Sequence, residues 1–225
     1  SVIDTIRSME VAADSEIACF AAAAILSAFE RAEIVVDDLS MEDVFDVLTL
    51  DLSKNRHFGT LTERLCSFDV RDIALSVNER MPSIKNSWGG IHLANLVGEL
   101  RLVDSIPILI DSLNRESGDF LCKAAQEALV RIGEPAQLML IARWGELDSS
   151  QRIYGRGVLE QVGGRHTAEF AVEHFQKLFR DDVEGWCGLA EAAPDEPSID
   201  LLEPELRRKQ PLIDETFYCL CMLTG

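Results

Sequence analysis

The stretch ALVRIGEPAQLMLIARW, residues 128–144, limits the possible folds of this chain more than any other segment. It is an apolar run that Gly133 and Pro135 interrupt. A glycine directly after an apolar helical segment is typical of a helix C-terminus, and a proline is tolerated in the first turn of the next helix. The stretch therefore predicts a helix that ends, turns at once and starts again, so that the two helices lie antiparallel or cross steeply.

The helix expected before this turn has the clearest periodicity in the chain. In residues 119–132, Phe120, Ala124, Ala128 and Ile132 recur every four residues and form one apolar stripe. Asp119 is a candidate N-cap for this helix. The segment therefore predicts an amphipathic helix that packs along one face.

The same break recurs on both sides of it. Residues 94–113 predict a helix that ends near Leu100 and restarts near Asp104 with Pro107 in its first turn, and residues 157–175 predict an end near Val162 and a restart near Arg165. The spacing from Leu100 to Ile132 is 32 residues, and from Ile132 to Val162 it is 30 residues. A period near 30 residues predicts stacked helical hairpins, an α-solenoid.

Strand patterns are scarce, so we expect an all-α fold. The helices are expected at residues 2–10, 15–31, 40–52, 60–67, 69–80, 86–100, 104–114, 119–132, 135–145, 149–162, 165–180, 183–192, 198–209 and 211–223. The further N-cap candidates are Ser40, Asp69, Asp104 and Ser198. The segment EIVVDDL, residues 33–39, is expected to be a loop or a helix edge.

The turn itself resembles a HEAT repeat, in which a helix ends in A-L-x-x-[IL]-G and the next begins with P-A. The matching residues are Ala128, Leu129, Ile132, Gly133, Pro135 and Ala136. The copy at 94–113 has Arg101 in place of the glycine, and the copy at 157–175 lacks the proline. The resemblance implies an α-α superhelix of antiparallel helix pairs over residues 83–225. Residues 1–82 are expected to form an N-terminal helical cap or degenerate repeats.

The resemblance implies a scaffold that binds a partner protein through a concave helical surface, without enzymatic activity. Two alternatives stay open: an enzyme or small-ligand carrier on a HEAT-like fold, such as a chromophore lyase, or a structural segment of a larger multidomain protein. Fold alone does not decide between these functions.

The net charge of −18 over 225 residues bears on the partners. A strongly acidic surface repels phosphate backbones and anionic lipids, which argues against nucleic-acid and membrane binding. The most apolar segment, residues 17–29, is too short to span a bilayer. The six scattered cysteines are expected to be buried thiols, and we expect a cytoplasmic protein.

No catalytic, metal-binding or cofactor-binding set is predicted. HEAT-like di-iron hydroxylases use repeated His-Glu pairs, whereas this chain has one pair, Glu173-His174, in reversed order. Cys219 and Cys221 point to different sides of a helix, which favours one buried and one semi-buried thiol over a metal site. The glycines in residues 155–164 follow no strand and match no nucleotide-binding pattern.

The candidate partner-binding residues are Arg152 and Arg156, one turn apart on a helix face, with Tyr154 nearby. They are expected to bind an acidic peptide or another anion in the concave groove. The alternative is ordinary pairing with nearby acids, such as Glu160 at four residues from Arg156. The acidic run 181–205 is expected to be a solvated face and loop, or else a contact for a basic partner.

Overall fold

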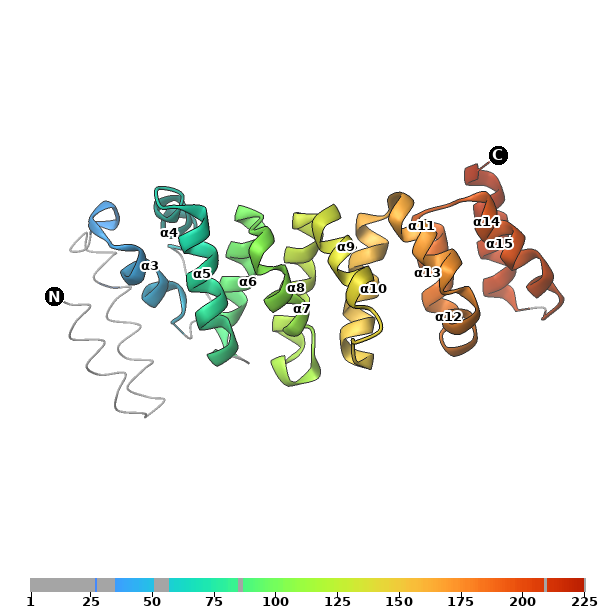
Figure 1. The fold of residues 1–225 in the computed structure, drawn as a ribbon, viewed down its shortest axis with the longest axis horizontal. Coiled ribbons are helices and arrows are strands. Elements are labelled where there is room, and N and C mark those ends of the chain that lie inside the picture. Colours follow the sequence, from blue (N-terminus) through green and yellow to red (C-terminus); the bar gives the residue numbers. More distant parts are fainter. Residues whose placement is uncertain (1–26, 28–34, 51–56, 85–86, 209, 225) are drawn as a thin grey trace. The chain divides into compact units, whose positions relative to one another are not determined.

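The computed structural model describes residues 27, 35–50, 57–84, 87–208 and 210–224 (Figure 1). Within these ranges the chain has thirteen α-helices, α3 to α15, with short 3₁₀ segments and no β-strand. The expectation of an all-α fold is confirmed. None of the helices in this part of the chain is long and apolar enough to cross a membrane. The helices expected at 2–10 and 15–31 lie outside the described residues, apart from residue 27, which is helical.

The chain divides into two compact units between Ala128 and Leu129, within α8 (Asp119–Ile132). This division differs from the boundary after residue 82 that the sequence suggests. The boundary after residue 82 stays a prediction.

The first unit is a set of short helices that match most of the expected segments. Its elements are η1 (Val36–Asp38), α3 (Met41–Leu48), α4 (Phe58–Leu65), α5 (Val70–Arg80), η2 (Met81–Ser83), α6 (Trp88–Leu100), η3 (Val103–Ser105), α7 (Ile106–Asp111), η4 (Arg115–Ser117) and the start of α8. Ser40 and Asp69 cap α3 and α5 as expected. Asp104 is not a cap, because it lies inside η3.

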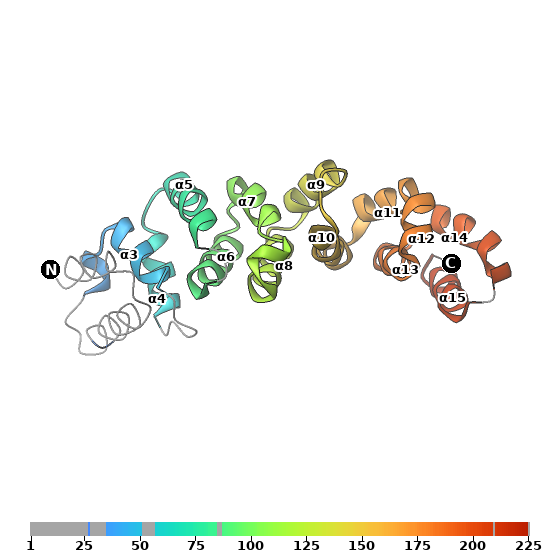
Figure 2. The ribbon, with the colours of Figure 1, turned by 90° about the horizontal axis from the view of Figure 1, so that it is seen from below.

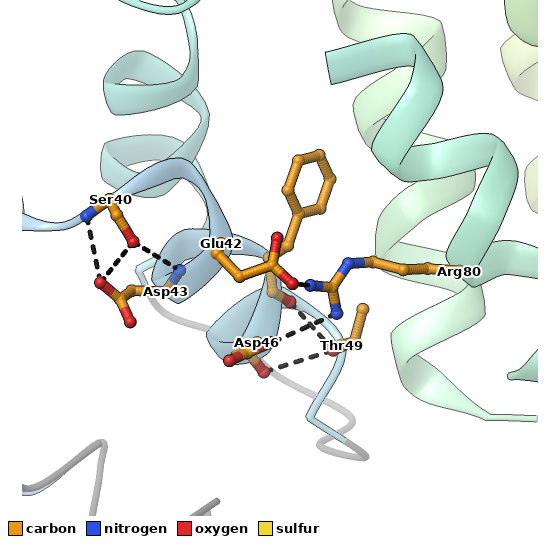
Figure 3. A network of polar contacts seen from close by, with 7 residues as sticks. Ser40, Glu42, Asp43, Asp46, Thr49 and Arg80 are labelled. Carbon is orange, nitrogen blue, oxygen red and sulfur yellow. Dashed lines mark hydrogen bonds and ion pairs between the residues drawn. The ribbon is translucent and has the colours of Figure 1, made fainter. Parts of the chain in front are cut away.

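Ion pairs join α5 to α3 in the first unit (Figure 3). Arg80 on α5 pairs with Glu42 and Asp46, which are one turn apart on α3, and its Nη1 lies 3.1 Å from Asp46 Oδ1. Its guanidinium carbon also lies 5.6 Å from the centroid of the Phe45 ring. The two carboxylates and the ring thus hold the arginine from one helix face.

The second unit contains the helices that follow the predicted turn. They are α9 (Glu134–Arg143), α10 (Ser149–Val162), α11 (Gly164–Glu173), α12 (Phe175–Asp181), α13 (Val183–Ala192), α14 (Glu196–Leu202), η5 (Glu203–Arg208) and α15 (Pro211–Thr224). The predicted cap Ser198 is wrong. Asp195 caps α14 instead, and its side chain accepts a hydrogen bond from the Ser198 backbone N–H.

The single helix expected over residues 165–180 is wrong, because the chain turns at His174 between α11 and α12. The Phe170 carbonyl accepts from the His174 backbone N–H at 3.0 Å and also contacts His174 Nδ1 at 3.1 Å. After the turn, Phe175 and Phe179 pack against Trp186, with ring centroids 4.9 and 5.5 Å away. A straight helix would direct these rings elsewhere, so tertiary packing decides the break.

The helices of the second unit lie in two rows (Figure 2). In one row α11 contacts α9 and α14, and in the other α13 contacts α10 and α15. Contacts also join α9 to α10, α11 to α13 and α14 to α15 across the rows. The buried side chain of Gln137 on α9 donates to the Gly163 carbonyl and to Thr167 Oγ1, both at 2.7 Å. This amide ties α9 to the turn between α10 and α11.

The three predicted breaks are real turns with an unusual backbone. Gly133 and Gly163 have φ values of 82° and 62°. Arg101, which takes the place of the glycine in the first copy, ends α6 with φ 49° and ψ 49°. It is the one non-glycine residue with positive φ in the described part of the chain. Arg101 is thus in the left-handed helical region, which its side chain disfavours, whereas Gly133 and Gly163 have ψ values of −134° and −152° and make a different turn.

Arg101→Gly is expected to raise the free energy of unfolding by about 0.5–1 kcal/mol. Relief of the left-handed strain is worth roughly 1–2 kcal/mol, and the greater freedom of glycine in the unfolded chain offsets part of it. Urea denaturation followed by circular dichroism measures the change.

Gly133→Ala is the matched control with the opposite sign. A Cβ at Gly133 would meet nothing within 4 Å, so a loss there, of order 1–3 kcal/mol, reports backbone conformation alone. A destabilised Arg101→Gly variant would contradict the turn geometry described for α6.

Candidate functional site

The strongest candidate site is a pocket of about 360 Å³ in the second unit, between α10, α12 and α13. Its apolar lining consists of Trp144, Ile153, Leu178 and Leu189, and its charged or ionisable lining of Arg152, Arg156, His174, Lys177, Asp181 and Asp182. The capped start of α10 at Asp148 places Arg152 and Arg156 one turn apart. The pocket therefore combines an apolar wall with several cations.

Arg156 is held within the protein by two carboxylates. Its guanidinium pairs with Asp182, which also caps α13 by accepting from the Gly185 backbone N–H at 2.9 Å. Its Nε lies 3.2 Å from Glu160 Oε1, as the alternative interpretation expected, but this buried N–H makes no hydrogen bond to the described residues. Gly185 makes room for the pair, because a Cβ there would collide with both charged groups.

Arg152 and Lys177 differ from Arg156 because neither pairs with a carboxylate among the described residues. Arg152 makes two long hydrogen bonds to the carbonyls of Trp144 and Gly145, at 3.4 and 3.5 Å. These carbonyls lie at the C-terminal end of α9, where a cation is favourable. Both side chains line the pocket, so they could meet an incoming anion.

The acids of the pocket already have partners. Asp182 pairs with Arg156, and Asp181 Oδ1 lies 3.1 Å from Arg180 Nε. With histidine neutral, three cations and two carboxylates give the pocket a net charge of +1, in a chain of net charge −18. The pocket thus opposes the sign of the protein as a whole.

The pKa of Glu160 is raised above its ordinary value. Burial is the largest cause, Arg156 lowers the pKa in part, and Asp182 raises it. The surroundings as a whole therefore disfavour the charged carboxylate, in spite of its arginine neighbour.

The stability of Glu160→Gln relative to the unsubstituted protein is expected to rise with pH. A carboxyl whose folded pKa is raised contributes stability below its unfolded pKa, about 4.3, and loses it as pH rises through the folded pKa. Denaturation curves at about pH 4 and pH 7 measure this difference.

Glu169→Gln is the control, because its hydrogen bond with Arg165 lowers the pKa of Glu169. Its relative stability should fall with pH. If Glu160→Gln followed the same direction as Glu169→Gln, the burial of Glu160 would be in doubt.

The structure places the predicted binding residues as follows. Arg152 and Arg156 line the pocket, whereas Tyr154 is half-buried, has contacts of its own and is outside the lining. Lys177 on α12 and His174 at the turn before it were not predicted, because the sequence predicted one continuous helix over residues 165–180. No local signal in the sequence marks the turn at His174 that brings Lys177 to the pocket.

The described residues include all four histidines and five of the six cysteines of the chain. No group of three or more His, Cys, Asp or Glu side chains there could hold a metal ion. His166 Nε2 lies 3.1 Å from Glu134 Oε1, and its Nδ1 lies 3.7 Å from Glu169 Oε2. Cys122 and Cys187 are buried as expected, but Cys66 and Cys221 are exposed and Cys219 is half-buried, which corrects that expectation. Cys19 lies outside the described residues.

A second pocket, of about 300 Å³, lies in the first unit at the N-terminal ends of α6 and α8. Its exposed aromatic pair, Trp88 and Phe120, has ring centroids 6.1 Å apart. It has no comparable set of cations, so the pocket of the second unit remains the stronger candidate.

Comparison of the chain with models of protein families, with curated proteins and with solved structures found no match. The likeness of residues 128–136 to a HEAT repeat therefore stays an expectation from the sequence.

Proposed function

We propose that the chain is a non-enzymatic interaction module, a HEAT-like solenoid of antiparallel helix pairs that binds a partner protein. Three observations support the architecture: the breaks 32 and 30 residues apart, their positive φ values, and the two rows of paired helices in the second unit. Such stacking leaves one face of each helix row open for a partner.

The binding surface in this proposal is the pocket between α10, α12 and α13. The observation that carries it is the pair of cations, Arg152 and Lys177, that line the pocket without carboxylate partners in a strongly acidic chain. Cations without a carboxylate partner beside an apolar wall favour an acidic partner, since charge complementarity speeds association and rejects partners of the wrong sign. Arg156 also lines the pocket, but its charge is already paired with Asp182 and Glu160.

Reversal of these two charges, Arg152→Glu with Lys177→Glu, is expected to abolish capture of partner proteins from native lysate. Arg156 is left unchanged because its replacement would leave Asp182 and Glu160 unpaired over Gly185 and disturb the fold. Loss of close charge pairs at an interface costs about 1.5 kcal/mol or more each, enough to remove bound protein in a wash.

The matched control is Arg131→Glu with Arg207→Glu. Both are exposed, neither lines the pocket, and the change in net charge is the same. Quantitative mass spectrometry compares the captured proteins. If the two double variants retain the same proteins equally well, the pocket is not the binding surface.

A further inference from the structure

We infer that the pocket of the second unit recognises a short linear peptide in which a large apolar side chain lies next to a carboxylate. The inference rests on the proposed function, since it names the ligand of the same surface. It goes further by predicting that an unfolded segment, rather than a folded domain, is sufficient for binding.

The pocket as a whole has room for one or two side chains of a peptide. Ile153 is 60% exposed at its edge, whereas Trp144 and Leu189 are 7% and 0% exposed, so Ile153 offers most of the apolar surface that these three present to a ligand. A volume of about 360 Å³ is at the small end of ligand pockets, which run from about 300 to 1,000 Å³. This size suits one or two side chains of a peptide, and the peptide would cover Ile153.

The charged side chains of the pocket favour a negative charge on the peptide next to the inserted apolar side chain. A carboxylate that enters the pocket meets Arg152 and Lys177, whose positive charges no described carboxylate neutralises. Asp181 and Asp182 repel it weakly because Arg180 and Arg156 already pair with them. A basic peptide would find no unpaired acid among the described residues of the lining, so the pocket discriminates against it.

Asp182 serves as an internal example of the proposed contact. Its Oδ2 pairs with the Arg156 guanidinium at the edge of the pocket, while its Oδ1 accepts the Gly185 N–H. The protein thus already binds one carboxylate between an arginine and a helix start at this place. The peptide carboxylate would lie beside it, on the two cations that remain.

The test is a selection from a random dodecapeptide display library on the unsubstituted protein, with counter-selection on Ile153→Asp/Lys177→Glu. Ile153 and Lys177 are exposed, so this variant is expected to keep the fold, and circular dichroism checks it. The expected result is enrichment of peptides with net negative charge and at least one large apolar residue beside an acid. Enrichment of basic or uncharged peptides, or no enrichment, would overturn the inference.

Fluorescence anisotropy then measures the affinity of an enriched peptide. Lys177→Glu, Arg152→Glu and Ile153→Asp are each expected to weaken binding about tenfold or more, and Arg131→Glu less than about twofold. Equal affinity for all four variants would contradict the assignment of the peptide to this pocket.

The two proposals fail in different ways. If lysate capture depends on Arg152 and Lys177 but the library yields no peptide, the partner is a folded surface. The proposed function then stands and the peptide inference is wrong. If capture is insensitive to these charges, the proposed function fails as well.

Discussion

Replacement of Trp186 by alanine is expected to lower the free energy of unfolding of the second unit by about 3–5 kcal/mol. Trp186 is fully buried and packs against Phe175 and Phe179, which come from another helix. Its Nε1–H donates to the Ala171 carbonyl at 2.8 Å, so one side chain joins α11, α12 and α13. The substitution leaves a large cavity and a buried carbonyl without its donor, and both effects destabilise.

Two further variants separate these causes. Trp186→Phe keeps most of the ring volume and loses the hydrogen bond, so a smaller loss of about 1–3 kcal/mol is expected. Trp88→Ala, at a position that is 37% exposed, should cost less than Trp186→Ala. Guanidinium denaturation measures all three, and a loss below about 1 kcal/mol for Trp186→Ala would contradict the described core.

Gly89→Ala is expected to destabilise the first unit by about 3 kcal/mol, at the upper end of the usual cost of overpacking. Gly89 is buried near the start of α6, against the end of α3. A Cβ there would lie 2.8 Å from the Thr49 carbonyl carbon and 2.9 Å from its Cα. Backbone atoms cannot swing away as the tip of a side chain can, so the two helices would have to separate.

The control for this prediction is Gly59→Ala in α4. A Cβ at Gly59 would meet nothing within 4 Å, and alanine favours a helix over glycine by about 0.8–1.0 kcal/mol. The two glycine substitutions should therefore change the thermal midpoint in opposite directions. A stabilised Gly89→Ala variant would show that α6 does not approach Thr49 as described.

Much of the helical pattern could be predicted because local signals mark the ends of the helices. The ranges 119–132, 149–162 and 183–192 were predicted to the residue, and Gly133 and Gly163 mark the ends of the first two. Pro107 and Pro135 also lie in first turns, as expected. These signals act within a few residues and therefore survive in the sequence alone.

The break at His174 could not be predicted, because its cause is not local. It depends on Phe175 and Phe179 reaching Trp186, which is seven to eleven residues further along the chain. The candidate site shows the same limit. The sequence spacing predicted that Arg152 and Arg156 lie on one helix face and that Arg156 can pair with Glu160. The packing of α12 and α13 brings Lys177 into the same pocket as Arg152 and pairs Asp182 with Arg156. Neither contact could be predicted from local spacing.

The charge exchange between Lys177 and the enriched peptide tests the central claim most directly. The affinities of four combinations are needed: both partners unchanged, Lys177→Glu alone, the peptide with one acid changed to lysine alone, and both changes together. If the pocket binds the peptide carboxylate through Lys177, each single change should weaken binding about tenfold and the doubly changed pair should bind about tenfold tighter than either single change, a coupling of about 2.8 kcal/mol. If the two single losses simply add in the double change, Lys177 does not contact the peptide acid and the account of the pocket is wrong.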